Sequence, residues 1–526
     1  MLNALRDQST QQPVVGRTRF DGAIFTEVAD FAGVTFTGRA DFDGTLFHDY
    51  ARFKTTRFAE RTKFMGAQFM SDLSFDRSTF DAAAFFTNAR VGGSIICTRV
   101  EFRDRAHFRL VKCEGEADFS QARFARADFS GSRFTERIDF KETIFASTPT
   151  LGPLVCADLV DLSGCVFEAP VTLELAAAEV RCTRTRWEST AELRLRHAAV
   201  NLRDAVLASP TAVTAHTAPF IVLGRELPED LLNGHVPSVQ VKSVQGVDAA
   251  HLVLTDTDLS DCQFSGAFHL DQIRVEGRTT FAPVPKGIHL RSRFWPIRWS
   301  QRRTLAEEHH WRAQAAGQTA PSPQHPPTER SWRAGPHHGD PARTPDPEDI
   351  AAVYRQLRKA FEDAKNEPGA ADFYYGEMEM RRHSRDATSH GERFLLHGYW
   401  LLSGYGLRAS RAILWLIAAM FTTILLLMGL GLPQHSPKQE ASGIVPAGGG
   451  RVTFTIDKDD PKNPTEDRFT GKRFEKALNV TLNSVIFRSS GQDLTTTGTY
   501  IEMTSRLLEP ALLALAVLAV RGRIKR

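Results

Sequence analysis

Phenylalanine recurs at fixed spacing along the first third of this chain. Two interleaved series, each with a period of eleven, run from Phe20 to Phe86 and from Phe25 to Phe80. Together they advance by five and six residues in turn, which fits neither the 3.6-residue period of a helix nor the two-residue period of a long strand. Each step is therefore predicted to be a short extended segment followed by a corner, and the chain is predicted to form a solenoid.

A small or short apolar residue stands two positions before almost every phenylalanine, as Ala29 does before Phe31. Residues i and i−2 of an extended segment share a face, so one small and one large side chain are predicted to point inward at each step. The predicted core ladder comprises Phe20, Phe25, Phe31, Phe36, Phe42, Phe47, Phe53, Phe58, Phe64, Phe69, Phe75, Phe80, Phe86, Phe108, Phe119 and Phe124.

The order of small residue, Asp and Phe resembles the consensus of the pentapeptide-repeat family. The matching triplets are Ala29-Asp30-Phe31, Ala40-Asp41-Phe42, Ala117-Asp118-Phe119 and Ala127-Asp128-Phe129. This resemblance implies a mainly β fold, a right-handed quadrilateral β-helix in which four steps make one coil. With steps of five and six, one coil needs 22 residues, so equivalent rings are predicted to stack about 4.8 Å apart.

The repeat sets the expected domain boundaries. After a tail at 1–16, the β-helix is predicted over 17–282, with one residue lost between Phe124 and Phe129 and an irregular insertion near 210–250. The six cysteines fall in the inward register or stand apart from any ligand-spaced motif, which favours reduced thiols in the core over disulfides. No metal site is predicted.

Charge within the repeat argues against a nucleic-acid partner. From Arg17 to Glu142 there are 20 Lys and Arg against 19 Asp and Glu. Some pentapeptide-repeat proteins act as strongly acidic mimics of DNA, and this balance does not match them. A basic stripe with interleaved surface aromatics, typical of nucleic-acid binding, is not seen either, because the aromatics belong to the core ladder.

Composition changes between 283 and 345, which is predicted to be a basic, Pro-rich linker and largely disordered. Its histidines, including His309, are expected to be solvated. A patch of Arg and Trp at the start of the linker is predicted either to contact a membrane interface or to form a solvated end cap of the solenoid. The residues assigned to that membrane contact are Arg291, Trp295, Trp299 and Arg303.

A helical hairpin is predicted over 346–390, where apolar residues recur at helical spacing on both sides of a Pro-Gly break. It resembles the membrane-proximal helix pair of bacterial membrane-anchored pentapeptide-repeat proteins. Glu377 and Glu379 look like a pair of catalytic carboxylates, but ion pairing with Arg381 and Arg382, or plain solvation, is the favoured interpretation.

The region 391–526 is predicted to enter a membrane, with spans near 412–432 and 500–520 and an extracytoplasmic loop between them. The first span has 21 uncharged residues, about 31 Å as a helix, which matches the hydrocarbon core. Arginines flank the spans on one side, so the β-helix and the C-terminus are predicted to be cytoplasmic. Glu509 is expected to face the other helix or a wet cavity.

The order of span, amphipathic segment and span is also that of two-span cation channels. Thr497, Gly498 and Tyr500 loosely resemble part of the TVGYG filter of potassium channels, and they form a possible pore-like loop. The full filter motif, which a row of coordinating carbonyls would need, is absent from the sequence.

Two functions from different classes remain, because the sequence shows no hydrolase, P-loop, zinc-protease or dinucleotide motif. The first is a non-enzymatic scaffold held at the membrane lipid, which presents the β-helix to an unidentified cytoplasmic protein. The second is a channel-like or transport protein with a cytoplasmic regulatory β-helix, which requires a homo-oligomer. No catalytic residue and no cofactor is predicted for either.

Overall fold

The computed structural model describes residues 13–286, 288–292, 295–298, 300–318, 330–335, 345–384, 388–433, 439–445, 448, 450–456, 467–486 and 494–524. The chain divides into two compact units, with the boundary after Met380. The first unit contains a parallel β-solenoid of about 12 turns, and the second is mainly helical. The solenoid and the helices that follow it confirm the predicted fold class.

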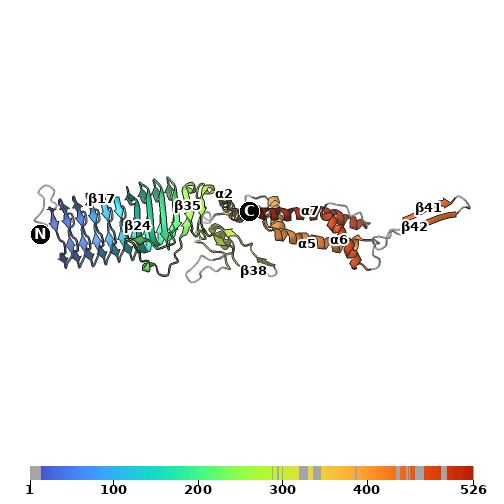
Figure 1. Cartoon of the computed structure of the whole chain (residues 1–526), viewed down its shortest axis with the longest axis horizontal. Helices are drawn as coiled ribbons and strands as arrows, with labels where there is room; N and C mark the ends of the chain where they lie inside the picture. The colour runs from blue at the N-terminus through green and yellow to red at the C-terminus, as the bar shows by residue number, and fades with distance from the viewer. Residues whose placement is uncertain are drawn as a thin grey trace. The chain divides into compact units, whose positions relative to one another are not determined.

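Each coil of the solenoid contributes one short strand to each of four walls. Thr18 pairs in parallel with Ala40, and Ala40 pairs with Thr62, so the coil has the predicted length of 22 residues. Figure 1 shows the coils stacked side by side from β1 onward. Four strands per coil agree with the quadrilateral cross-section.

The strands are assigned to walls by their pairing. The first wall contains β1 (Val14–Val15), β5 (Thr35–Phe36), β9 (Arg57–Phe58), β13 (Thr79–Phe80), β17 (Glu101–His107), β20 (Arg123–Asp128), β23 (Ile144–Phe145), β25 (Val166–Phe167), β27 (Arg186–Trp187) and β30 (Val206–Leu207). The second wall contains β2 (Thr18–Arg19), β6 (Ala40–Asp41), β10 (Thr62–Lys63), β14 (Ala84–Phe85) and the ends of β17 and β20.

The other two walls belong to one larger sheet. The third contains β3 (Ile24–Phe25), β7 (Leu46–Phe47), β11 (Gln68–Phe69), β15 (Arg90–Val91), β18 (Lys112–Cys113) and β21 (Arg133–Phe134). The fourth contains β4 (Ala29–Asp30), β8 (Ala51–Arg52), β12 (Leu73–Ser74), β16 (Ile95–Ile96), β19 (Ala117–Asp118) and β22 (Ile138–Asp139). The same sheet continues through β24 (Thr150–Asp161), β26 (Val171–Arg181), β28 (Ala191–Arg196), β29 (Ala199–Asn201), β31 (Thr211–Ala215), β34 (Gln240–Ser243), β35 (Leu252–Thr255) and β36 (Arg274–Glu276).

The predicted loss of one residue is visible in the strand register. Phe102 pairs with Phe124, but a few residues later Arg105 pairs with Arg126, so β20 has one residue fewer than β17 over the same stretch. The coils shorten again further on, where Val171 pairs with Ala191. These later coils have 20 residues.

Stacked rings fill the first coils. Rings of successive coils lie 4.6 to 5.4 Å apart by centroid and are nearly parallel. Rings within a coil meet edge to face, as Phe42 and Phe53 do. The ladder residues from Phe31 to Phe124 are buried, whereas Phe20 and Phe25 at the first coil are only half-buried.

The irregular insertion leaves the solenoid after β31 and returns at β34, within the predicted limits of 210–250. Ala199 pairs with Gln240, across the insertion, whereas Glu179 pairs with Ala199 one coil earlier. The insertion contains the antiparallel hairpin of β32 (Ile221–Val222) and β33 (Arg225–Glu226), followed by a 3-10 turn, η2 (Asp230–Leu232).

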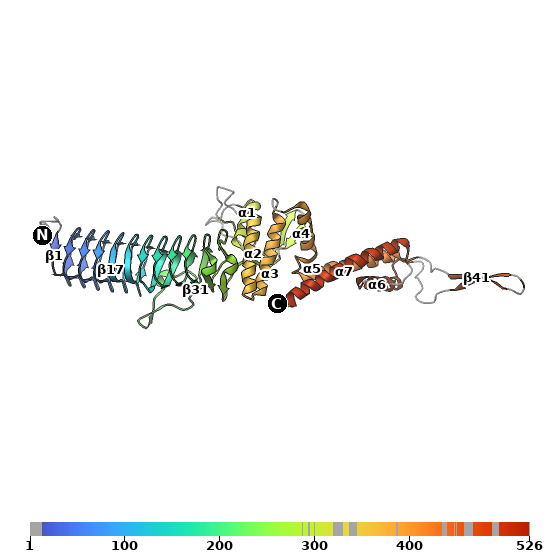
Figure 2. The same cartoon turned by 90° about the horizontal axis from the view of Figure 1, so that it is seen from above.

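The end of the solenoid is closed by short 3-10 turns and three helices. They are η3 (Ala249–His251), η4 (Leu270–Gln272), α1 (Ala306–Ala315), α2 (Pro347–Asp363) and α3 (Glu367–His383). Helix α2 contacts η4, and Figure 2 shows α2 and α3 side by side at the end of the rod. The strands β37 (Ala282–Pro283) and β40 (Arg303–Thr304) pair next to them, and β38 (Ile288–Ser292) pairs with β39 (Trp295–Arg298).

The prediction of a largely disordered linker is wrong for residues 300–318. Leu305, Ala306 and Ala313 are buried there, and the backbone N–H groups of Phe264 and Ser265 in the solenoid donate hydrogen bonds to Glu307 of α1. Apolar contacts with the last coil stabilise a helix that composition alone does not predict. Parts of the linker, including 319–329 and 336–344, lie outside the described residues.

The second unit contains four helices, a π-helical turn and a β-hairpin among its described residues. These are α4 (His390–Ser403), α5 (Ala409–Leu426), the π turn η6 (Leu427–Gly431), α6 (Gly471–Val485), α7 (Thr496–Ile524), β41 (Gln439–Val445) and β42 (Gly450–Ile456). Among the described residues, two segments are long and apolar enough to cross a membrane, Ala409–Gly431 and Thr496–Arg521.

All six cysteines are buried and unpaired. Cys97, Cys113, Cys156, Cys165, Cys182 and Cys262 are therefore core side chains. Burial raises the pKa of Cys113 and of Cys156 to about 12, so both thiols stay protonated at neutral pH. Protonated, buried thiols are poor nucleophiles and poor metal ligands.

Candidate functional site

The insertion is fixed to the side of the solenoid by buried ion pairs. The Arg196 guanidinium donates two hydrogen bonds to the Glu229 carboxylate, at 2.6 and 2.9 Å. His197 approaches the same carboxylate at 2.9 Å with Nε2 and the carbonyl of His235 at 3.0 Å with Nδ1. Burial alone would raise the pKa of Glu229, but Arg196 and His197 lower it below its ordinary value. Arg133 and Asp230 form a further ion pair.

An apolar seat lies beneath the insertion. Phe220, Leu227 and Leu232 cover Val155 and Ala176, two residues that point outward from the later coils yet are fully buried. Such an outward apolar pair would be exposed without the insertion, at a cost of about 25 cal/mol for each Å². The insertion is therefore a packed part of the solenoid surface.

The tip of the insertion is apolar and exposed. Ile221 is 68% exposed and Leu223 is 71% exposed, although both lie in or beside the β32–β33 hairpin. Val236, at the far end of the insertion, is 71% exposed. A well-anchored segment that presents large apolar side chains is typical of a protein-binding surface. Sequence reasoning placed the insertion but did not identify these residues.

A second cluster, here called the cap network, is buried between the solenoid end and the three helices. The carboxylate of Glu308 accepts two hydrogen bonds from Arg302 at 2.6 and 2.7 Å, one from Arg312 at 2.7 Å and one from the Tyr354 hydroxyl at 2.6 Å. Arg312 also pairs with Glu379 at 3.2 Å. Burial would raise the pKa of Glu308, but the two guanidinium groups hold it far below its ordinary range.

Glu377 and Glu379 are ion-paired, but with other partners than those expected. Glu377 pairs with Arg355 at 3.0 Å and with Arg358 at 3.1 Å, both on α2. Sequence neighbours were predicted, and the fold supplies arginines from α1 and α2 in their place. Because both carboxylates are saturated by cations inside the cap, they do not form a catalytic pair.

His309 corrects a further expectation, because it is not solvated. Its Nδ1 accepts a hydrogen bond from the backbone N–H of Arg333 at 3.2 Å, and its Nε2 lies 2.8 Å from the Thr304 hydroxyl, which donates to the Ala282 carbonyl. Burial lowers the pKa of His309 to about 3. The ring is therefore neutral and structural.

In the second unit, a buried carboxylate faces the neighbouring apolar helix as expected. Thr423 of α5 donates a hydrogen bond to one oxygen of Glu509 of α7 at 2.9 Å. The second oxygen of Glu509 is buried and has no hydrogen-bond partner among the described residues. A cavity of about 570 Å³ lies between the two helices, and its lining includes the hydroxyl groups of Thr422, Tyr500 and Thr504.

The ends of these helices are tied together by backbone contacts. Gly498 approaches Gly431 so closely that a Cβ on Gly498 would lie 2.3 Å from the Gly431 carbonyl oxygen. Thr495 donates its backbone N–H to the same carbonyl at 2.9 Å. The guanidinium of Arg473 on α6 donates to the carbonyls of Met428 and Leu432, which lack helical partners after the π turn.

The predicted pore-like loop is wrong in its conformation. Thr497, Gly498 and Tyr500 lie in the first turns of α7, not in an extended loop. Their backbone carbonyls are directed along a helix, so they cannot form a row of ion ligands. The glycine serves the close approach to Gly431.

The predicted Arg and Trp patch is only partly described. Arg303 lies in β40, and its backbone N–H donates a hydrogen bond to Asp372 of α3 at 3.3 Å. Arg291 and Trp295 belong to the β38–β39 hairpin, while Trp299 lies outside the described residues. Contact of this patch with a membrane stays a prediction.

The geometry defines a class first: a parallel, four-walled β-solenoid with an aromatic core ladder and 22-residue coils. The sequence model of pentapeptide repeats matches residues 14–57 and 98–144, with nine copies of the repeat. Through its solenoid the chain therefore belongs to the pentapeptide-repeat family. Comparisons with curated proteins and with solved structures gave no match.

Proposed function

We propose that this protein is a non-enzymatic scaffold that is tethered to a membrane by α5 and α7 and presents its solenoid to a protein partner. The observation that carries the proposal is the exposed apolar surface of α5, which would be unfavourable in water. It comprises Ile413, Leu414, Trp415, Ile417, Phe421 and Leu425. Segments of 23 and 26 residues also match the length needed to cross a bilayer.

Charge supports one orientation of the tether. Arg393, Arg408 and Arg411 precede the first apolar segment, and Arg521 follows the second, whereas Asp457, Asp459 and Asp460 lie between the segments. By the positive-inside rule, the solenoid and the C-terminus are cytoplasmic.

Cysteine labelling tests this orientation without background, because the native thiols are all buried. Gly448→Cys places a thiol at the exposed turn between β41 and β42, and Thr37→Cys places one on the exposed face of the solenoid. A membrane-impermeant maleimide is expected to label Gly448→Cys in intact cells, and Thr37→Cys only after permeabilisation. The reverse pattern would invert the topology, and labelling of both in intact cells would contradict the tether.

The insertion is the surface that we assign to the protein partner. Its exposed Ile221 and Leu223 stand on a segment fixed by Glu229 and by the apolar seat, so little conformational entropy is lost on binding. The variant Ile221→Ser/Leu223→Ser removes the apolar tip and leaves the anchors. Quantitative pull-down with the full chain is expected to lose the partner with this variant. Ile24→Ser, at another exposed apolar residue, is the matched control and should retain it.

A transport function is the second candidate, and the buried pair of Glu509 and Thr423 is the observation that favours it. An ionisable residue between membrane helices often marks a pathway for ions or protons. Full-length protein in liposomes would then give an ion or proton flux that Glu509→Gln abolishes. Absence of flux from an oligomeric sample would remove this candidate and leave the scaffold.

A further inference from the structure

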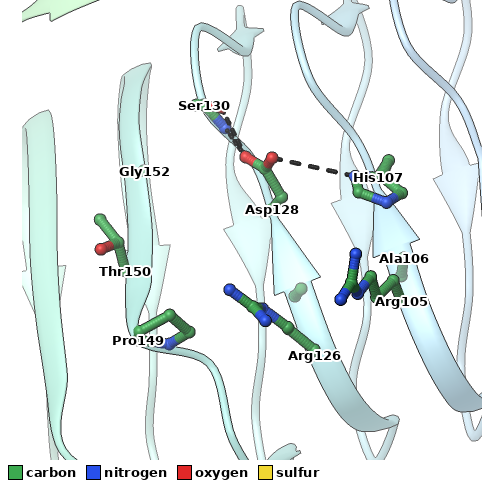
Figure 3. Close-up of a pocket in the computed structure, with 10 residues that line it drawn as sticks. Arg105, Ala106, His107, Arg126, Asp128, Ser130, Pro149, Thr150 and Gly152 are labelled. Atoms are coloured by element: carbon green, nitrogen blue, oxygen red, sulfur yellow. Dashed lines mark hydrogen bonds and ion pairs between the residues drawn. The ribbon is translucent and has the colours of Figure 1, made fainter.

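A hollow on the solenoid surface is lined by two arginines from neighbouring coils. Arg105 at the end of β17 pairs in strand register with Arg126 of β20. The hollow has a volume of about 340 Å³, and Pro149, Thr150 and Gly152 line it beside Arg126. Figure 3 shows both arginine side chains in this hollow, with Pro149 and Thr150 near the end of Arg126.

The position of the hollow follows from the shortened coil. Because β20 lacks one residue between the partners of Phe102 and Arg105, the register shifts just before the two arginines. The second wall then ends, and β24 begins at Thr150. The change from short strands to a long strand leaves a gap in the wall that the arginine side chains border.

The two guanidinium groups have no counter-ion among the described residues. Neither side chain forms an ion pair or hydrogen bond there, and both are exposed. Within the same described part of the chain, Asp104, the neighbour of Arg105, forms no ion pair with either arginine. The nearby carboxylate of Asp128 is shared by His107 at 3.9 Å and Arg109 at 3.6 Å.

Other arginines at the same position of the second wall are engaged. Arg39 pairs with Glu60 at 3.8 Å, and Arg61 lies over the ring of Phe85 at 5.7 Å. In contrast, Arg105 and Arg126 face each other across adjacent strands, which lie about 4.8 Å apart. Like charges held in register are destabilising, and an anion bound between them would relieve the repulsion.

We propose that this hollow binds a phosphate-type oxyanion, bridged by Arg105 and Arg126 from two successive coils. A dianion neutralises both cations, and a tetrahedral oxyanion presents several oxygens to the forked guanidinium donors. The ligand is either free phosphate or the head group of a phospholipid. The site is independent of the protein partner and of the apolar tip of the insertion.

Calorimetric titration of the full chain with inorganic phosphate tests the site, with the protein in phosphatidylcholine nanodiscs and sodium chloride at matched ionic strength as the reference. Saturable binding is expected for the wild type, and the Kd is expected to rise about tenfold or more for Arg105→Gln/Arg126→Gln. Arg105→Lys/Arg126→Lys, which keeps the charge but loses the fork, should give a smaller rise.

The control is Arg90→Gln/Lys112→Gln. Arg90 and Lys112 are likewise a cationic pair in register, on the third wall and outside the hollow. Unchanged Kd in this control supports the site. An equal loss in both double variants, or no saturable binding of phosphate by the folded wild type, overturns the proposal.

A second arm distinguishes the two sources of phosphate. In nanodiscs that also contain phosphatidic acid, a raised apparent Kd for inorganic phosphate would show that a lipid head group occupies the hollow. An unchanged Kd would assign the hollow to soluble phosphate. Both results require that Arg105→Gln/Arg126→Gln abolishes the effect.

Discussion

The coils between Thr18 and Phe145 and those between Thr150 and Ala215 follow the same path with different side chains inside. The first set uses two-residue strands, 22-residue coils and stacked phenylalanines. In the second set β24 and β26 run for 12 and 11 residues, the coils have 20 residues, and Leu173, Leu193 and Val213 stack inside.

The difference shows that the inner side chain and the corners are chosen together. Each corner of the first coils needs a residue at positive φ, and Gly44, Thr55 and Gly66 occupy three of them. Long strands replace some corners in the later coils, which shortens the coil. Leucine and valine, smaller than phenylalanine, then fill the interior at close-packed density.

The largest effect is expected from emptying an aromatic position. Phe64→Ala removes a fully buried ring that stacks on Phe42 and Phe86, and it should cost about 3–5 kcal/mol of unfolding free energy in the isolated first unit. Phe85→Ala is the control, since this half-buried ring points outward and stacks only on His107, so about 1 kcal/mol is expected. Equal losses in urea denaturation would contradict the core ladder.

Acid sharpens the contrast between the apolar first coils and the buried polar groups that close the last ones. His309 has a pKa of about 3 in the folded protein and 6.5 when unfolded, so the unfolded state binds the proton first. The stability is complete at neutral pH and falls as the pH drops from about 6.5 towards 3. The loss at pH 5 is about 2 kcal/mol.

The variant His309→Gln should flatten this pH dependence while lowering the stability at neutral pH. Thermal unfolding at a series of pH values measures both quantities. An unchanged slope in the variant would assign the acid sensitivity to other groups.

A swap between the two sets tests whether interior size matters. Leu193→Phe places the side chain of the first coils into a later coil, between Leu173 and Val213. Overpacking is expected to cost about 1–3 kcal/mol in urea denaturation, although phenylalanine is the usual residue of the repeat. Leu193→Met, with nearly conserved volume, should cost less, and a stabilised Leu193→Phe would contradict the idea of a narrower interior.

The smallest effect concerns the corners. Thr55 is a β-branched residue at φ 54, whereas Gly44 and Gly66 occupy the equivalent corners of the adjacent steps at φ 63 and 66. Thr55→Gly should therefore raise the melting temperature, by about 1 kcal/mol of stability, and Gly66→Thr should lower it. The same sign for both substitutions would contradict the role of the corners.

Much of the fold was predictable because the repeat is local and redundant. The spacing of Phe102 and Phe124, with the lost residue that follows them, is enough to set the strand register. The candidate surfaces were less accessible. Ile221 and Leu223 look like ordinary apolar residues in the sequence, and only the anchoring of Glu229 by Arg196 leaves them exposed on a fixed segment.

The sequence by itself determined the coil length, the inward positions and the two apolar helices, because each of these follows from spacing or composition along one segment. The tertiary structure alone decided the partners of Glu308 and Glu377, the burial of His309 and the meeting of Arg105 with Arg126. Ion pairs, burial and the field of neighbouring charges depend on which segments share a wall or a cap. That arrangement is fixed only when the coils stack and the helices close their end.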